Sequence, residues 1–176
     1  MLKRLPSFAN ILPLYSVIAA MTYGWTISKF LWKLPSWLLF LNIGEALALF
    51  AYAMVSALVE SLLILGILLL ASLVLPAKFF KDEFIIRGAW FVMVAYGAMM
   101  IYLSLYTTQG QMLGAYWTAW FGGLLSLAVL AAYISPRIHF ARSLALWLSD
   151  RLIIFLFIFI PTSVISLLVV IVRNLN

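Results

Sequence analysis

Long apolar runs separated by short polar stretches make up most of this chain. A helix that crosses the hydrocarbon core of a bilayer needs roughly 20 mostly apolar residues, and several of the runs reach this length. The pattern predicts an all-α fold, a polytopic transmembrane helical bundle of five or six spans with short loops, in a single integral membrane domain over residues 1–176. The spans are expected at about residues 11–31, 37–56, 58–76, 89–106, 113–134 and 150–172.

The number of spans depends on the apolar stretch over residues 37–75, which contains a single carboxylate near its middle, Glu60. In one arrangement two helices meet in a tight turn at Ser56–Ser61, and Glu60 lies at the membrane surface. In the other, one long span begins near Gly44 or Glu45, and Glu60 lies toward the bilayer centre.

Length and charge favour the two-helix arrangement. One helix over the whole stretch would extend close to about 60 Å, roughly twice the thickness of the hydrocarbon core. A carboxylate inside the hydrocarbon costs on the order of 2.5 to 3.5 kcal/mol on insertion scales. Against this, Ser56–Ser61 contains none of the Gly, Pro or Asn residues that turns usually recruit. Six spans are therefore the preferred prediction.

The N-terminal segment begins with basic residues, Lys3 and Arg4, followed by an apolar run, as a secretory signal peptide would. The run is long and aromatic, contains Pro13, and is not followed by a clear small-residue cleavage site. It is interpreted as a retained first span.

A basic, amphipathic segment precedes the last apolar run, with arginines set against Phe140, Leu144 and Trp147. Such an arrangement suits the membrane surface, so an interfacial helix is expected near residues 137–149. The last span then begins near Asp150, and Pro161 within it predicts a kink.

Composition supports the membrane assignment, because 67% of the residues are hydrophobic and 9% are charged. Soluble proteins carry roughly 25% charged residues, so this chain has too little polar surface to face water all round. The lipid bilayer is its expected surroundings. The chain contains no cysteine, which excludes disulfides and Cys-ligated metal or iron–sulfur sites.

The formal net charge of +6 is interpreted as a signal of topology. The basic residues are scattered through short loops instead of lining a face, so nucleic acid is not an expected partner. The positive-inside rule places the loops over residues 77–88 and 135–149 in the cytoplasm and the C-terminus outside. The N-terminus lies outside with six spans and in the cytoplasm with five. The absence of cysteine and the compact loops favour a bacterial cytoplasmic (inner) membrane.

A candidate intramembrane polar site comprises Asn42, Glu45, Tyr52 and Glu60. On one continuous helix these residues and Ser56 share a face, and such a polar stripe is a candidate lining for a cation or proton path. With two helices, Glu45 is the only one of the two glutamates inside a span. Glu45 is therefore the first functional candidate and Glu60 the second; the competing interpretation is a carboxylate at a helix end or in helix packing.

Two further groups of residues are candidates for contacts with lipid or protein. Arg137, His139 and Arg142 are candidate contacts for an anionic lipid headgroup. A helix-packing face, used within the bundle or by a partner, is expected where small residues recur at every fourth position. These are Gly110, Gly114, Thr118, Gly122 and Ser126.

Motifs of common enzymes are absent from the sequence, which has no phosphate-binding Gly-rich loop, no HExxH and no Gly-x-Ser-x-Gly. No catalytic residues, cofactor or metal are therefore assigned. The leading hypothesis is a non-catalytic accessory, scaffolding or assembly subunit of a membrane complex or pathway, which binds another membrane protein or a second copy of itself. The alternative is a small transporter, channel or substrate-binding membrane component that uses Glu45. A lipid-handling enzyme that uses Arg137, His139 and Arg142 is the third option.

Overall fold

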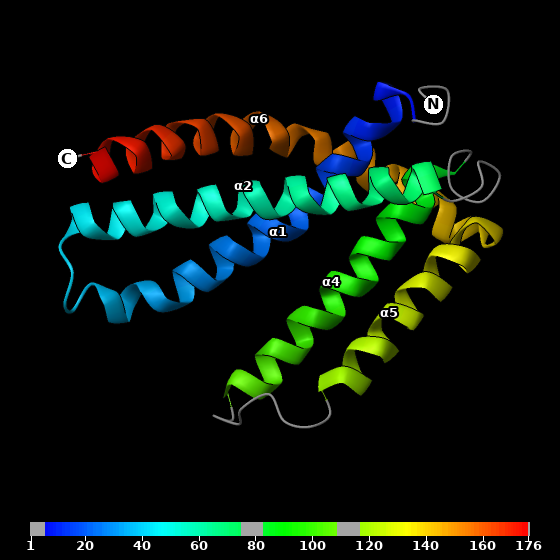
Figure 1. The fold of residues 1–176 in the computed structure, drawn as a ribbon, viewed down its shortest axis with the longest axis horizontal. Coiled ribbons are helices and arrows are strands. Elements are labelled where there is room, and N and C mark those ends of the chain that lie inside the picture. Colours follow the sequence, from blue (N-terminus) through cyan, green and yellow to red (C-terminus); the bar gives the residue numbers. More distant parts are fainter. Residues whose placement is uncertain (1–5, 75–82, 109–116, 176) are drawn as a thin grey trace.

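The computed structural model describes residues 6–74, 83–108 and 117–175, and this part of the chain is helical (Figure 1). The expectation of an all-α helical bundle is confirmed. Four helices are long and apolar enough to cross a membrane, while α5 is described over 18 residues. The elements are α1 (Phe8–Trp37), α2 (Ile43–Val74), α4 (Phe84–Thr108), α5 (Trp117–Ile134), the short 3-10 helix η2 (Ser135–Arg137) and α6 (His139–Leu175).

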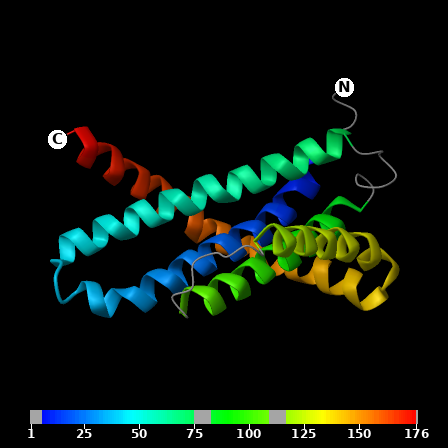
Figure 2. The same ribbon diagram turned by 60° about the horizontal axis from the view of Figure 1, so that its bottom comes forward.

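The helices meet at one end of the molecule and diverge from there. The first turns of α1, α4 and α6 and the last turns of α2 and α5 gather at this junction (Figure 1). From the junction, α1 runs with α2 and α6 in one direction, and α4 runs with α5 in another (Figures 1 and 2). Helix α1 packs against α2, α4 and α6, so it is the central element of the bundle.

Helix α2 is continuous over 32 residues, so the prediction of a tight turn at Ser56–Ser61 is wrong. The reversal occurs earlier, over residues 38–42, and α2 begins at Ile43 as in the single-helix alternative. A stripe of small or narrow residues faces the neighbouring helices through the region of the expected turn; Met54, Ala57 and Ser61 are buried there. This stripe packs without interruption, and the segment contains no Gly, Pro or Asn residue that would favour a turn.

Helix α6 is also continuous, so the expected interfacial segment near residues 137–149 is not separate from the last span. Its first half buries Ala141, Ala145 and Ser149 at every fourth position, and the Trp90 indole N–H donates to the Ala141 carbonyl at 3.0 Å. These small residues let the segment pack against the bundle. Its other face remains exposed and carries both charged and apolar side chains. The segment forms the first turns of a long helix.

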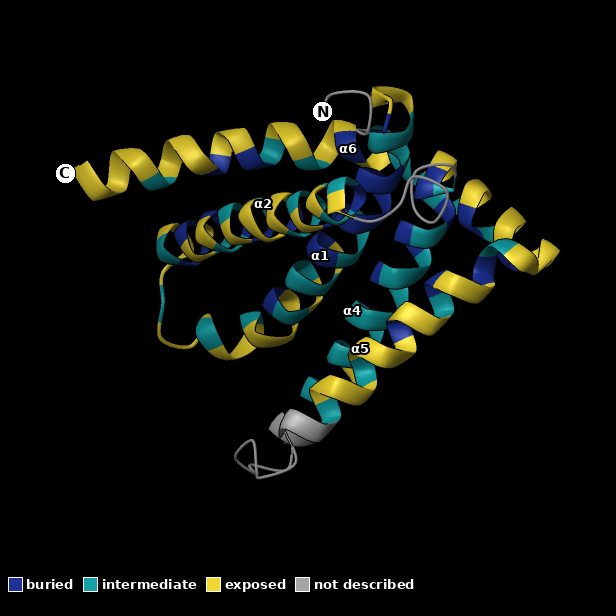
Figure 3. Cartoon of the chain, turned by 45° about the vertical axis from the view of Figure 1, so that its right-hand side comes forward, coloured by how far each residue is buried: buried dark blue, intermediate teal, exposed yellow. Residues whose placement is uncertain are grey.

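Hydroxyl groups join α1 to its neighbours inside the bundle. The Tyr15 hydroxyl lies 3.2 Å from Ser61 Oγ of α2, and the Tyr23 hydroxyl lies 2.6 Å from Ser163 Oγ of α6. Buried residues are concentrated on α1, whereas α5 and the C-terminal half of α6 are largely exposed (Figure 3). Interhelical hydrogen bonds are a common stabilising contact where apolar surface alone does not drive helices together.

Candidate functional site

A cleft of about 510 Å³ lies between α1, α2 and α4, where α4 diverges from the other two helices. Several polar side chains line it among aromatic and aliphatic residues. The polar lining consists of Thr26, Lys29, Lys33, Ser56, Glu60 and Tyr96.

Glu60 is the carboxylate of this cleft. It lies near the middle of α2, about 26 Å from Ile43 by the rise of an α-helix. The Tyr96 hydroxyl of α4 donates a hydrogen bond to Glu60 Oε2 at 3.3 Å. The middle of this candidate span therefore presents its acid to a polar cleft and a phenol, which reduces the cost of a carboxylate at this depth.

Lys29 and Lys33 enter the cleft from α1, one helical turn apart. The Lys29 ammonium lies 4.2 Å from the centre of the Trp25 ring, one turn closer to the start of α1. In the part of the chain that the structure describes, the ion pairs do not join either lysine to Glu60. The cleft thus holds two cations and an anion that do not neutralise one another by direct contact.

The charges follow an order along the cleft. Antiparallel pairing of α1 with α2 sets Phe30 against Phe50, with ring centres 5.1 Å apart, and Tyr15 against Ser61. Lys29 therefore lies near the level of Phe50, and Glu60 lies closer to the junction of the helices. The lysines line the end of the cleft near residues 38–42, and the exposed carboxylate of Glu60 lies farther along the cleft toward the junction.

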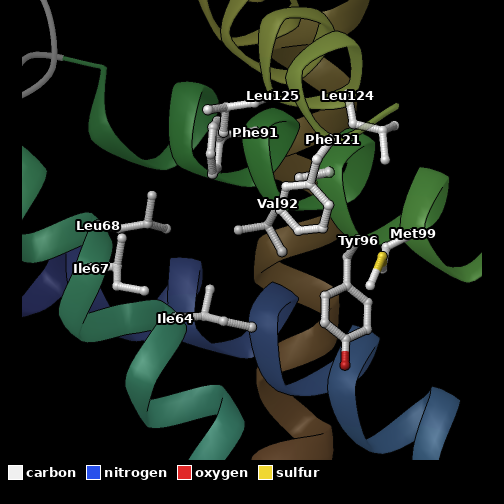
Figure 4. A pocket seen from close by; sticks show the side chains of 11 residues that line it. Ile64, Ile67, Leu68, Phe91, Val92, Tyr96, Met99, Phe121, Leu124 and Leu125 are labelled. Atoms are coloured by element: carbon white, nitrogen blue, oxygen red, sulfur yellow. The ribbon is translucent and has the colours of Figure 1, made fainter. Parts of the chain in front are cut away.

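An apolar pocket of about 310 Å³ adjoins the cleft on the side of α5 (Figure 4). Tyr96 and Met99 line both spaces. The Tyr96 ring lies among the apolar side chains, while its hydroxyl points away from them, toward the polar side (Figure 4). The remaining lining side chains come from α2, α4 and α5 and include Ile64, Leu68, Phe91, Val92, Phe121 and Leu125.

The other residues of the predicted intramembrane site lie outside this cleft. Asn42 and Glu45 form a reciprocal cap at the start of α2, because each backbone N–H donates to the other side chain at 2.9 Å. This is the pattern of a capping box, and it corresponds to the helix-end interpretation of Glu45. The Tyr52 hydroxyl accepts a hydrogen bond from Asn174 Nδ2 at 2.9 Å. Of the predicted set, Glu60 alone lines the cleft.

Arg137, His139 and Arg142 do not share one partner. Arg137 donates to the Tyr133 hydroxyl and stacks over that ring, 4.0 Å from its centre, whereas Arg142 lies 3.6 Å from Glu83. His139 is exposed at the start of α6. Because the two guanidinium groups have different neighbours, the structure gives no support to a common anion site here.

The predicted helix-packing face is described only in part. Gly110 and Gly114 lie outside the described residues, and Thr118 falls in the first turn of α5. Gly122 and Ser126 are exposed, and a Cβ added at Gly122 would meet nothing within 4 Å. These two positions do not pack against the residues that the structure describes, and contact with a partner stays a prediction.

The contribution of α1 to the cleft was not among the predictions from the sequence. The recurrence of Trp25, Lys29, Lys33 and Trp37 at every fourth residue was available as a signal of one polar-aromatic helix face. Tyr96 had no comparable signal, since its role depends on the position of α4 beside α2.

Among the residues that the structure describes, no group of three or more His, Cys, Asp and Glu side chains could hold a metal ion. The chemistry available in the cleft is therefore that of ammonium, carboxylate and hydroxyl groups next to an apolar space. Comparison with known proteins gives no match: no family model fits the chain, and no curated protein or solved structure is detectably similar to it.

Proposed function

We propose that this chain is a multi-pass membrane protein that binds an amphipathic ligand from the bilayer and acts as a non-catalytic, substrate-binding component of a membrane complex or pathway. The observation that carries the proposal is the hydrogen-bonded pair of Glu60 and Tyr96. The pair lies in a cleft that adjoins an apolar pocket and also holds two lysines without an ion pair to any acidic residue that the structure describes. Ionisable groups within membrane spans are costly and are usually retained for function.

The proposed orientation places the junction of the helices in the cytoplasm of a bacterial cell. Arg87 and Arg142 lie in the first turns of α4 and α6, and Arg137 lies in η2 directly before α6, so these basic side chains agree with the positive-inside rule. With α5 as a fifth crossing, the N-terminus is cytoplasmic and the C-terminus lies outside. The lysine end of the cleft then faces the outer surface, where ligand enters either from the outer leaflet or from water.

Filling the cleft should remove ligand binding. Ser56 lines the cleft, so Ser56→Trp is expected to reduce the lipid that remains bound after purification by at least about tenfold. Leu63→Trp is the matched control, because Leu63 lies on the same helix and is 60% exposed. Bound lipid is measured by native mass spectrometry of protein released from mild detergent. Equal lipid occupancy in the two variants would contradict the proposed function.

An accessory or assembly subunit is the second candidate, and the outward position of Gly122 and Ser126 favours it. Small residues on a lipid-facing helix surface allow a second helix to approach closely. Gly122→Leu should then shift the protein from an oligomer or complex to the monomer in gentle detergent, as measured by size-exclusion chromatography with light scattering. A wild-type protein that is monomeric and carries no partner would remove this candidate.

A further inference from the structure

We infer that the ligand of the cleft is a single-chain anionic amphiphile of the lysophospholipid type. Its phosphate contacts Lys29 and Lys33, a hydroxyl group donates to Glu60, and its acyl chain occupies the apolar pocket. The inference rests on the proposed function and specifies the ligand class of that same cleft.

The position of the ligand's anionic end is inferred from the two lysines of the cleft. Lys29 and Lys33 lie one turn apart on one face of α1 and line the same cleft. Neither forms an ion pair with an acidic side chain among the described residues. Two neighbouring ammonium groups with free donors match a phosphate, which offers several acceptor oxygens. Trp25 and Trp37 also line this end, and indoles suit the membrane–water interface.

The chemical nature of the middle of the ligand is inferred from Glu60. A carboxylate repels a phosphate, so the anionic end cannot lie beside it. Glu60 has two oxygens with several acceptor positions, and Tyr96 uses one of them at 3.3 Å. A neutral hydroxyl next to the phosphate, as in the glycerol of a lysophospholipid, can donate to the remaining positions.

The position of the ligand's acyl chain is inferred from the apolar pocket, which begins where the polar cleft ends. Tyr96 and Met99 form the boundary between the two spaces, and the tail pocket is the smaller of the two, about 310 Å³ against about 510 Å³. A small pocket favours one acyl chain over two. The resulting order of phosphate, hydroxyl and chain matches the order of Lys29, Glu60 and Ile64 from the end of the cleft inward.

This orientation agrees with the proposed topology. The lysines lie toward the outer surface and the apolar pocket lies deeper, so the bound molecule has its headgroup at the membrane surface and its chain toward the interior. A lipid in the outer leaflet has the same orientation. It therefore reaches the cleft by lateral movement without turning over.

The test compares two probes with the same acyl chain, lauroyl lysophosphatidate and monolauroylglycerol, added to the full-length protein in phosphatidylcholine nanodiscs. Lysophosphatidate should bind at least about tenfold more tightly, the effect of one or two charge-assisted contacts. Lys29→Gln and Lys33→Gln should each reduce this preference. Arg173→Gln is the control for general surface charge, since Arg173 is exposed in the last turn of α6.

A second comparison tests the hydroxyl contact at Glu60. Lauryl phosphate, which has a chain and a phosphate without the glycerol hydroxyl, should bind wild-type protein more weakly than lysophosphatidate does. Glu60→Leu should abolish this difference, whereas Glu60→Gln should retain part of it, because the amide oxygen still accepts. Thermal unfolding of each variant separates loss of the contact from loss of the fold.

The outcomes distinguish the inference from the proposed function. Equal binding of lysophosphatidate and monolauroylglycerol, with both lost in Ser56→Trp, would overturn the anionic headgroup and leave the binding function standing. Binding of neither probe to the wild-type protein, with lipid occupancy unchanged in Ser56→Trp, would overturn both. Binding that falls as much in Arg173→Gln as in Lys29→Gln would assign the effect to surface charge and overturn the specific site.

Discussion

Single cysteines introduced at Ser7 and Ile138 should be labelled from one face of the membrane, and those at Ser36 and Leu175 from the opposite face. All four positions are exposed, near helix ends. The structure places the start of α1 and the start of α6 at the same end of the molecule, with the ends of both helices away from it (Figure 1). Because the chain has no cysteine of its own, each label reports one position.

The measurement uses a membrane-impermeant maleimide on intact spheroplasts and on inside-out vesicles. Each cysteine should be labelled in one of the two preparations and remain unlabelled in the other. A turn at Ser56–Ser61 would instead group Ser7 with Leu175 and Ser36 with Ile138, so that grouping would contradict the continuous α2. A detergent-solubilised sample, in which all four cysteines react, is the control for reactivity.

Gly88→Val should destabilise the protein far more than Gly97→Val, although both substitutions lie in α4. A Cβ at Gly88 would lie 2.7 Å from Leu14 Cδ2 and 2.9 Å from Leu14 Cδ1, closer than such contacts allow. Leu14 is fully buried in the junction core and cannot move aside freely. Overpacking of this kind costs on the order of 1 to 3 kcal/mol. At Gly97 a Cβ would meet nothing within 4 Å.

The free energy of unfolding can be measured by titrating mixed micelles with sodium dodecyl sulfate. Leu14→Ala should recover part of the loss when it is combined with Gly88→Val, because it removes the atoms that clash. A double-mutant cycle isolates this coupling. Equal costs for the two valine substitutions, or additive costs for Leu14→Ala and Gly88→Val, would show that the contact does not limit the packing of α1 on α4.

The close approach at Gly88 also bears on the cleft. At this glycine α4 approaches the Leu14 side chain of α1 closely, and the two helices diverge toward the C-terminal end of α4 (Figure 1). The opening between the two helices begins beyond this contact. A side chain at position 88 is therefore expected to change the width of the cleft as well as the stability of the junction.

The long apolar stretch over residues 37–75 shows where reasoning from helix length and charge led to a wrong prediction. A length of about 30 Å is required of a helix that crosses the hydrocarbon along its normal, and α2 with its 32 residues exceeds it. A helix in a bundle can tilt or extend beyond the hydrocarbon, so length does not require a break. The turn chemistry of Ser56–Ser61 was the better guide, since this segment lacks the Gly, Pro and Asn residues that turns usually recruit.

Glu45 and Glu60 show the same limit at the candidate site. Both acids were identified from the sequence, as was their possible position on one helix. Their order of importance depended on where α2 begins, because a glutamate three residues after Asn42 completes a cap only if the helix starts at Ile43.

The sequence by itself determined that this protein is built from long apolar helices with its basic residues near their ends. Hydrophobicity and charge are properties of each segment, and a bilayer acts on each segment separately. The tertiary structure decided which polar side chains meet. Lys29, Glu60 and Tyr96 belong to three helices, and their meeting depends on how α1, α2 and α4 cross. The crossing is set by close packing at small residues such as Gly88, which hydropathy does not report.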